Sequence, residues 1–408
     1  MIPAAGLATA LVFASAADAR PPTVVPPRDF IEYWSAARVH AQGGDPYDGG
    51  QLLPYQREAS GEPDKTQAVM LWTPPWTLPL YLPFGLLDPR TGHLLWLAAQ
   101  AAAVAVSTRL LWRVYGGPAE AGALGRRAWM LAPLAAAGFG PVWWLLVFGQ
   151  NTGFVLLGLA GFLYLRTRGY PVAAGAAAAL TAIKPHLLAL FGLALLLDAV
   201  ATRDGRRALL GGVGALLVAS AVAVIPNPDV FREFAAALAR PASQESPNMA
   251  GWKLPLAAYW LRVWLAPGSF RVQFVPCAVA CALLVPYWWA RRRTWDWAAE
   301  APRLVFASVL LAPYGAWIFD LVVLLVPAVR AFTRVARWDR PVPVTAAAAA
   351  YLLLSLATLT VPAVVVSRLG WEHALHHFIW VAPAVLGWCL VVVARPPAAI
   401  IPPAEAPS

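Results

Sequence analysis

The carboxylate of Asp29 is a side chain that could accept a proton in a reaction, and it stands at the start of the first predicted outer loop. It lies in the polar stretch "PPRDFIEYWSAARVHAQGGDPYD", residues 26–48, of a chain that is otherwise mostly apolar. Glu32 follows three residues later, which resembles a capping box with Asp29 at the N-cap position. Two roles are therefore open for Asp29, helix cap and general base. They are compatible, because a helix N-terminus stabilises the ionised carboxylate that a base requires.

An apolar stripe follows Asp29 at the spacing of one helix face. Its members are Phe30, Tyr33, Trp34 and Ala37. Gly43 and Gly44 would end this helix, and the residues 45–47 would form a turn. The pattern predicts a short amphipathic helix that lies on a membrane surface.

Lys184 is the second candidate for chemistry. It lies between two apolar segments in "AAGAAAALTAIKPHLLAL", with a proline directly after it. An ionisable side chain at membrane depth is energetically costly and is for that reason a functional candidate. Its ammonium could bind the phosphate of a lipid as a point charge. The alternative is a lysine at a helix end whose side chain extends to the aqueous interface.

Gln150, Asn151 and Asp320 are further polar residues beside or within apolar segments. Gln150 and Asn151 follow "WWLLVFG", and they either form a tight interhelical turn with an asparagine cap or form hydrogen bonds with sugar hydroxyls. In the second case, the tryptophans would provide a stacking wall. Asp320, in "APYGAWIFDLVVLL", needs a partner when buried, either in a structural ion pair or in an active site.

Three weaker candidates are Tyr314, Asn248 and His376. Tyr314 precedes Asp320 in the same apolar segment, and Asn248 precedes the aromatic stretch 252–264, which is typical of a membrane-interface belt. His376 has helical spacing with two other histidines, but a metal site needs more ligands than this stretch offers. An interfacial helix with a contact to an acceptor is the favoured interpretation.

The composition indicates the class of fold that must position these residues. Of the 408 residues, 60% are hydrophobic and 13% are charged, whereas a soluble globular protein has about 25% charged residues. The chain is therefore predicted to be an all-α polytopic membrane protein. The net charge of +10 comes from arginines in short clusters between apolar segments. Such clusters indicate membrane topology rather than binding of nucleic acid, so no nucleic-acid partner is expected.

The apolar segments predict a single integral membrane domain, 1–408, with about twelve transmembrane helices. If the arginine clusters are all cytoplasmic, twelve spans place both termini in the cytoplasm. The first helix, near 2–19, could instead be a signal peptide. Two large extracytoplasmic loops follow from the parity, 20–91 and 227–271. Within the first loop, the proline-rich segment 71–89 would be a re-entrant or membrane-surface element, and the alternative is a second transmembrane helix. The predicted spans are 2–19, 92–115, 128–148, 151–166, 170–184, 185–201, 207–226, 272–290, 303–315, 317–330, 343–366 and 374–395.

The same topology places almost every unusual polar residue on one face of the membrane. A transporter should instead have polar residues at mid-depth in broken helices, often in repeats. The one-sided pattern favours an enzyme over a transporter or flippase of a lipid-linked precursor. A structural membrane component is the third possibility.

Five segments in order resemble glycosyltransferase family 87, the polyprenol-phosphate-mannose-dependent mannosyltransferases of the GT-C class. They are "DFIEYWSAARVHAQGGDPYD", "WTPPWTLPLYLPFGLL", "FGQNTGFVLLGLAGFLY", "GYPVAAGAAAALTAIKPHLLAL" and "LLAPYGAWIFDLVVLLVPA". The resemblance implies a GT-C bundle and an aspartate in the first outer loop as general base, which is Asp29 here. The segment 53–69 has no counterpart in the family pattern.

The resemblance also implies the substrates. We expect transfer of a sugar, mannose by default, from a polyprenyl-phosphate donor to a glycolipid or polysaccharide acceptor. The site would lie on the extracytoplasmic face of the cell's inner membrane, among membrane lipids, and transfer would invert the anomeric carbon. No cofactor is expected, and no metal is required, although Asp29 and Glu32 together could hold one weakly. Lys184 and His186 would bind the donor phosphate. The expected substrate-binding residues are Glu32, Tyr33, Gln150, Asn151, Asn248, Tyr314, Asp320 and His376.

Overall fold

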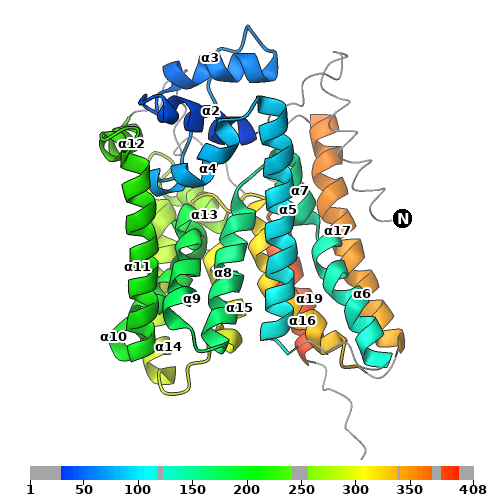
Figure 1. The fold of residues 1–408 in the computed structure, drawn as a ribbon. Coiled ribbons are helices and arrows are strands. Elements are labelled where there is room, and N and C mark those ends of the chain that lie inside the picture. The colour runs from blue at the N-terminus through cyan, green and yellow to red at the C-terminus, as the bar shows by residue number, and fades with distance from the viewer. Residues whose placement is uncertain (1–28, 117–122, 241–255, 339–340, 370–377, 395–408) are drawn as a thin grey trace, which may run out of the picture.

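A computed structural model describes residues 29–116, 123–240, 256–338, 341–369 and 378–394, and all regular secondary structure in these ranges is helical. The predicted all-α class is therefore confirmed for the described part of the chain. Long helices run along the molecule from end to end, and shorter helices gather across one end (Figure 1). The long ones include α5 (Pro89–Val114), α11 (Arg203–Val224), α14 (Val275–Arg291) and α17 (Pro341–Leu369).

Four helical segments in the described ranges are long and apolar enough to cross a membrane. They are Pro89–Val114, Arg203–Val224, Phe270–Arg291 and Val342–Leu369. A fifth span results if Met130–Ala137 and Gly140–Phe148, which meet at an angle of 51°, are counted as one. The predicted number of about twelve is not confirmed. Breaks at prolines and at Lys184 leave several predicted spans as shorter helices, among them Thr152–Thr167, Pro171–Ile183, Pro185–Ala201 and Val381–Ala394.

The helix predicted after Asp29 forms as α2 (Phe30–Ala41), but its two faces do not differ in exposure. Ten of its twelve residues are buried, including the polar Glu32 and Ser35. The predicted amphipathic character was therefore wrong, because α2 is covered by protein on both faces. It packs against α3 (Gly49–Ser60), α4 (Leu78–Gly85) and α5. Together with α12 (Val230–Ala239), the helices α2, α3 and α4 form a cap over one end of the bundle (Figure 1).

The predicted turn after α2 is present. The Asp45 carboxylate accepts a hydrogen bond from the backbone N–H of Tyr47 at 2.8 Å. The proline-rich segment 71–89 contains the 3-10 helix η1 (Pro75–Thr77) and the eight-residue α4. Eight helical residues extend only about 12 Å, which is too short to cross a bilayer. The alternative of a second transmembrane helix in this segment is therefore excluded.

Helix α8 (Thr152–Thr167) lies inside the bundle, between α5 and α9 (Pro171–Ala178). Its sequence is apolar on all sides, and eleven of its sixteen residues are buried. A helix that is apolar all round is typical of such an interior position. The remaining helices of the bundle are α6 (Ala123–Ala137), α7 (Gly140–Phe148), α10 (Ala189–Ala201), α13 (Ala257–Leu265), α15 (Trp297–Leu310), α16 (Leu325–Val335) and α19 (Val381–Ala394).

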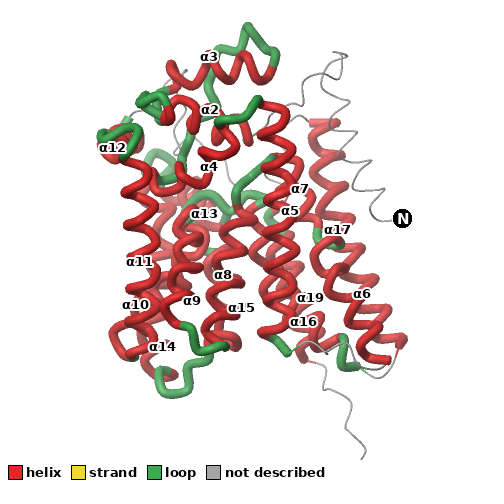
Figure 2. Tube along the Cα trace, viewed as in Figure 1, coloured by secondary structure: helices red, strands yellow, loops and turns green. Residues whose placement is uncertain are grey.

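Several of the clustered arginines form ion pairs at the end of the bundle opposite the cap. The turns that follow α8 and α14 lie at that end (Figure 2). Arg166 contacts the buried Asp198 carboxylate at 3.4 Å, and Asp198 also accepts a hydrogen bond from the Trp297 indole at 3.0 Å. Arg291 at the end of α14 contacts the buried Glu300 of α15 at 3.4 Å. These arginines therefore also stabilise contacts between helices.

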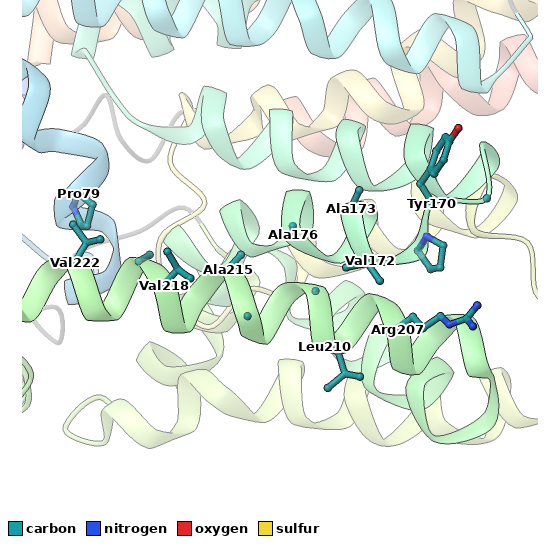
Figure 3. A pocket seen from close by; sticks show the side chains of 15 residues that line it. Pro79, Tyr170, Val172, Ala173, Ala176, Arg207, Leu210, Ala215, Val218 and Val222 are labelled. Atoms are coloured by element: carbon teal, nitrogen blue, oxygen red, sulfur yellow. The ribbon is translucent and has the colours of Figure 1, made fainter.

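An apolar groove with a volume of about 1020 Å³ lies between α9 and α11. Figure 3 shows Pro79 and Val222 at one end of it and Tyr170 and Arg207 at the other. The two helices approach closely beside it, because Gly175 leaves room for the backbone of α11. A Cβ atom at this position would overlap the carbonyl oxygen of Ala208.

We expect Gly175→Ala to lower the free energy of unfolding by about 1–3 kcal/mol, because the added methyl group forces the two backbones apart. Thermal unfolding of the purified protein in detergent measures this effect. Gly214→Ala is the matched control on α11, since nothing lies within 4 Å of a Cβ atom there. Equal stability of the two variants would contradict the close packing of α9 on α11.

Candidate functional site

A cluster of buried and half-buried polar side chains lies where the cap meets the bundle. Four segments contribute to it: the start of α2, the turn between α7 and α8, the break before the 3-10 helix η3 (Pro185–Leu188), and the 3-10 helix η6 (Asp320–Leu324). The cluster contains Asp29, Gln150, Thr152, Lys184 and Asp320. These segments are far apart in sequence, and only the fold brings them together.

The turn between α7 and α8 fixes Gln150. Gly149 ends α7 in the left-handed conformation, with φ +69°. Its N–H donates to the Leu146 carbonyl at 3.2 Å, and the Gln150 N–H donates to the Leu145 carbonyl at 3.1 Å. This pair of bonds is a Schellman motif, which glycine favours because it has no Cβ atom. The "FGQN" sequence therefore ends α7 sharply and presents Gln150 to the cluster.

The carboxamide of Gln150 links three side chains. Its Nε2 donates to Oδ2 of Asp29 at 2.8 Å. Its Oε1 accepts hydrogen bonds from the Tyr33 hydroxyl and from Nζ of Lys184, both at 2.8 Å. Gln150 thus stands directly between the carboxylate and the ammonium that the sequence singles out.

Lys184 occupies a break in the helical backbone. The 3-10 helix η2 (Ala179–Ile183) ends before it, and Pro185 begins η3 directly after it. A residue before proline disfavours the helical conformation, and Lys184 has φ −133° and ψ 72°. Its side chain turns inward and is 11% exposed, so the alternative of a lysine extended to the interface is wrong.

Three acceptors surround the Lys184 ammonium. Nζ donates to Gln150 Oε1 at 2.8 Å, to Thr152 Oγ1 at 3.1 Å and to Asp320 Oδ1 at 2.7 Å. An ammonium group has three N–H donors, so these contacts use its full capacity. The Asp320 carboxylate is 1% exposed. It also accepts from the Thr152 hydroxyl and, at 3.1 Å, from the backbone N–H of Trp317.

Asp29 occupies the N-cap position of α2, as the sequence predicts, but its side chain makes no cap hydrogen bond. The capping-box interpretation was wrong in this respect. The backbone N–H of Asp29 donates to the Phe148 carbonyl at 3.0 Å, and its carboxylate accepts from Gln150. The turn after α7 therefore holds both the backbone and the carboxylate of Asp29.

Glu32 is a buried carboxyl group one helical turn after Asp29, and it is 8% exposed. Burial, reinforced by the negative charge of Asp29, raises its pKa from 4.5 to about 8. At neutral pH Glu32 is therefore mainly protonated and can donate a hydrogen bond. The two carboxyl groups differ in environment, since Asp29 alone accepts the Gln150 amide.

The remaining predicted site residues lie in separate contacts or outside the described ranges. The Asn151 amide donates to the Tyr81 hydroxyl at 2.9 Å, in a second hydrogen-bonded group beneath the cap. The rings of His186 and Tyr314 pack against each other with centroids 4.2 Å apart. Asn248 and His376 lie outside the described residues.

Two residues of this region were missed by the sequence analysis. Thr152 bridges Lys184 and Asp320, and Tyr81 joins Asn151 to Thr73, whose hydroxyl lies 3.1 Å from that of Tyr81. The position of Thr152 directly after Gln150 and Asn151 was the available signal. Nothing in the sequence near Tyr81 distinguishes it from other interfacial aromatic residues.

The described residues contain no group of three or more His, Cys, Asp or Glu side chains arranged to hold a metal ion. The pair that the sequence suggests as weak metal ligands, Asp29 and Glu32, provides only two carboxyl groups and is not part of any such larger group in these ranges.

A family model for glycosyltransferase family 87 matches residues 72–313, more than half of the chain. The chain belongs to this family. It is thus a membrane glycosyltransferase, with sugar donor and acceptor substrates. The matched range of family 87 includes Gln150, Thr152 and Lys184, whereas Asp29 and Asp320 lie outside it. No curated protein and no solved structure matches the chain significantly.

We expect Lys184→Met to lower the free energy of unfolding by about 3–5 kcal/mol, because it leaves the buried Asp320 carboxylate without its cation. The double variant Lys184→Met/Asp320→Asn should recover most of this loss, since both charges are then absent. Thermal unfolding in detergent measures both effects. Lys65→Ala is the control, because its 3.6 Å pair with Glu62 is at the surface. A double variant as unstable as Lys184→Met would argue against the ion pair as the cause.

The raised pKa of Glu32 predicts a pH dependence of stability. Between 4.5 and about 8, folded Glu32 binds more protons than unfolded Glu32, so this residue makes stability fall as pH rises. Glu32→Gln lacks this effect, so its stability relative to the wild type should increase from about pH 5 to about pH 8. Unfolding measured across this range tests the prediction. The exposed Glu58→Gln should show a constant difference, and a constant difference for Glu32→Gln as well would contradict the raised pKa.

Proposed function

We propose that this membrane glycosyltransferase moves a sugar from a polyprenyl-phosphate donor to a hydroxyl of a lipid or glycan acceptor, with Asp29 as general base. One observation carries the proposal: a single carboxamide, that of Gln150, joins the Asp29 carboxylate to the buried Lys184 ammonium. A base for the attacking hydroxyl and a cation for an anionic leaving group are the two charged groups that such a transfer needs.

The reaction follows from this pair. The acceptor hydroxyl gives its proton to Asp29 while its oxygen attacks the anomeric carbon. The bond from that carbon to the phosphate oxygen breaks, and the phosphate leaves with the electron pair. One displacement inverts the configuration. A phosphate leaving group is stable as an anion, so no second catalytic carboxyl is needed, unlike the acid–base pairs of most glycoside hydrolases.

Lys184 would stabilise the leaving phosphate. Its three N–H groups already have acceptors, so a phosphate oxygen must replace or share one of them. The Thr152 hydroxyl is the neutral acceptor with the longest contact, 3.1 Å, and is the one we expect to yield. Asp320 would keep the ammonium in place. His186, two residues along the chain and packed against the Tyr314 ring, would contact the same phosphate.

The other assignments are part of the same proposal. Protonated Glu32 would donate a hydrogen bond to a substrate hydroxyl, while Tyr33 and Asn151 would shape the sugar site. Tyr314, Asn248 and His376 would contact the donor or acceptor. Mannose remains the default sugar.

We also propose the membrane topology of the chain. Counting the short helices as tilted spans gives about twelve in one domain, 1–408, with the loops 20–91 and 227–271 outside. The arginine-rich ends would face the cytoplasm. The cap and the polar cluster would then lie on the extracytoplasmic side of the inner membrane. Membership of family 87 favours the enzyme over the transporter alternative.

Asp29→Asn tests the base directly. We expect a loss of transfer of at least about 100-fold, within the range for removal of a general base, with the protein still folded. Membranes containing the variant are incubated with radiolabelled polyprenyl-phosphate sugars, and the products are identified. Asp64→Asn, at an exposed position, should retain full activity. Near-normal transfer by Asp29→Asn would remove Asp29 from the reaction.

A further inference from the structure

The carboxamide of Gln150 can be oriented in only one way in this cluster. Its Oε1 lies 2.8 Å from the Lys184 ammonium, and its Nε2 lies 2.8 Å from the Asp29 carboxylate. The reverse orientation would place an NH₂ group against the ammonium and an oxygen against the carboxylate. Both contacts would then be repulsive, so the charges on either side fix the amide.

Both the oxygen and the nitrogen of the Gln150 carboxamide form hydrogen bonds with other side chains. Oε1 accepts from both Tyr33 and Lys184, so both lone pairs are occupied. Donors to the oxygen, one of them cationic, draw electron density from the amide and strengthen Nε2–H as a donor. Asp29 therefore receives a hydrogen bond that depends on the charge of Lys184.

The backbone around Gln150 is held as firmly as its side chain. Its own N–H bonds to Leu145, and the neighbouring Gly149 carbonyl accepts the Trp96 indole N–H at 2.7 Å. The Phe148 carbonyl accepts the Asp29 N–H. Gln150 is 6% exposed. A side chain so enclosed, with both ends bonded to protein, is better suited to orient other groups than to bind sugar.

We propose that Gln150 is a positioning residue that orients the Asp29 carboxylate and couples it to the Lys184–Asp320 ion pair. This inference rests on the proposed function, since it assumes Asp29 to be the base. It replaces the expectation that Gln150 binds substrate hydroxyls. A phosphate that binds the Lys184 ammonium in place of Thr152 offsets part of its positive charge, which weakens its effect on Oε1 and hence the Nε2–H donor. Donor binding therefore makes Asp29 a stronger base.

Gln150→Met tests this role, because methionine has a similar size but lacks the carboxamide that makes the three hydrogen bonds to Asp29, Tyr33 and Lys184. We expect kcat to fall by about 10–100-fold, the effect of losing one charge-assisted hydrogen bond in the transition state. The KM for the polyprenyl-phosphate sugar should change by less than about threefold. The acidic limb of the pH–rate profile should move to higher pH, because the ionised carboxylate has lost a donor.

Gln56→Met is the matched control. Gln56 is also a fully buried carboxamide, but it lies within the cap, where it donates from α3 to Ser35 of α2 at 3.0 Å and to the Val69 carbonyl at 2.8 Å. Its loss should lower the thermal unfolding temperature while leaving the pH–rate profile of the folded enzyme unchanged. If Gln150→Met does not fold, Gln150→Glu decides. It keeps the acceptor for Tyr33 and Lys184 but places a negative charge beside Asp29, so the acidic limb should move further to higher pH.

The outcomes separate the two proposals. A wild-type enzyme that transfers no sugar from polyprenyl-phosphate donors overturns the proposed function, and this inference with it. An active wild type with an unshifted pH–rate profile in the Gln150 variants overturns this inference alone. A raised KM with unchanged kcat would also overturn it and return Gln150 to substrate binding.

Discussion

The buried contact between Lys184 and Asp320 is the interaction on which the arrangement of the site depends. The two charges lie 2.7 Å apart, and burial of either one alone would be strongly unfavourable. Their pairing, completed by Thr152 and Gln150, fixes three segments relative to one another. The helix break at Lys184 and the turn before Asp320 are thereby held in register with the start of α8. The polar cluster therefore depends on this ion pair, because burial of either charge without its partner among the surrounding apolar helices would be unfavourable.

The cap gives this cluster its enclosure. Helix α2 is covered on both faces, so Asp29 and Glu32 lie between the cap and the bundle rather than on a surface. Removal of water strengthens each electrostatic contact in such a place. It also separates the two carboxyl groups chemically, since burial keeps Glu32 protonated at neutral pH while the Gln150 amide supports the charge of Asp29. Two neighbouring acids can therefore have different roles, which is how one site can provide both a base and a hydrogen-bond donor.

The two ends of the molecule are built differently. At one end, short helices and turns bring polar side chains from distant segments into contact. At the other, Arg166 pairs with Asp198 and Arg291 pairs with Glu300, and both pairs join neighbouring helices. The catalytic proposal concerns the first end, where the range matched by the family model contributes Gln150, Thr152 and Lys184. Asp29 and Asp320 come from outside the matched range, so the complete cluster is a product of the whole chain.

The sequence by itself determined the helical class, the family and several turns, because these depend on local patterns. Apolar segments, the "FGQN" turn and the proline after Lys184 each act within a few residues. Asp29, Gln150, Lys184 and Asp320 were all candidates from residue type alone. Only the tertiary structure decided how they combine. It turned the Asp29 carboxylate from its own helix to Gln150, buried α2 instead of leaving it at a surface, and added Thr152. These outcomes depend on charge pairing and burial between segments more than a hundred residues apart, and no local pattern carries that information.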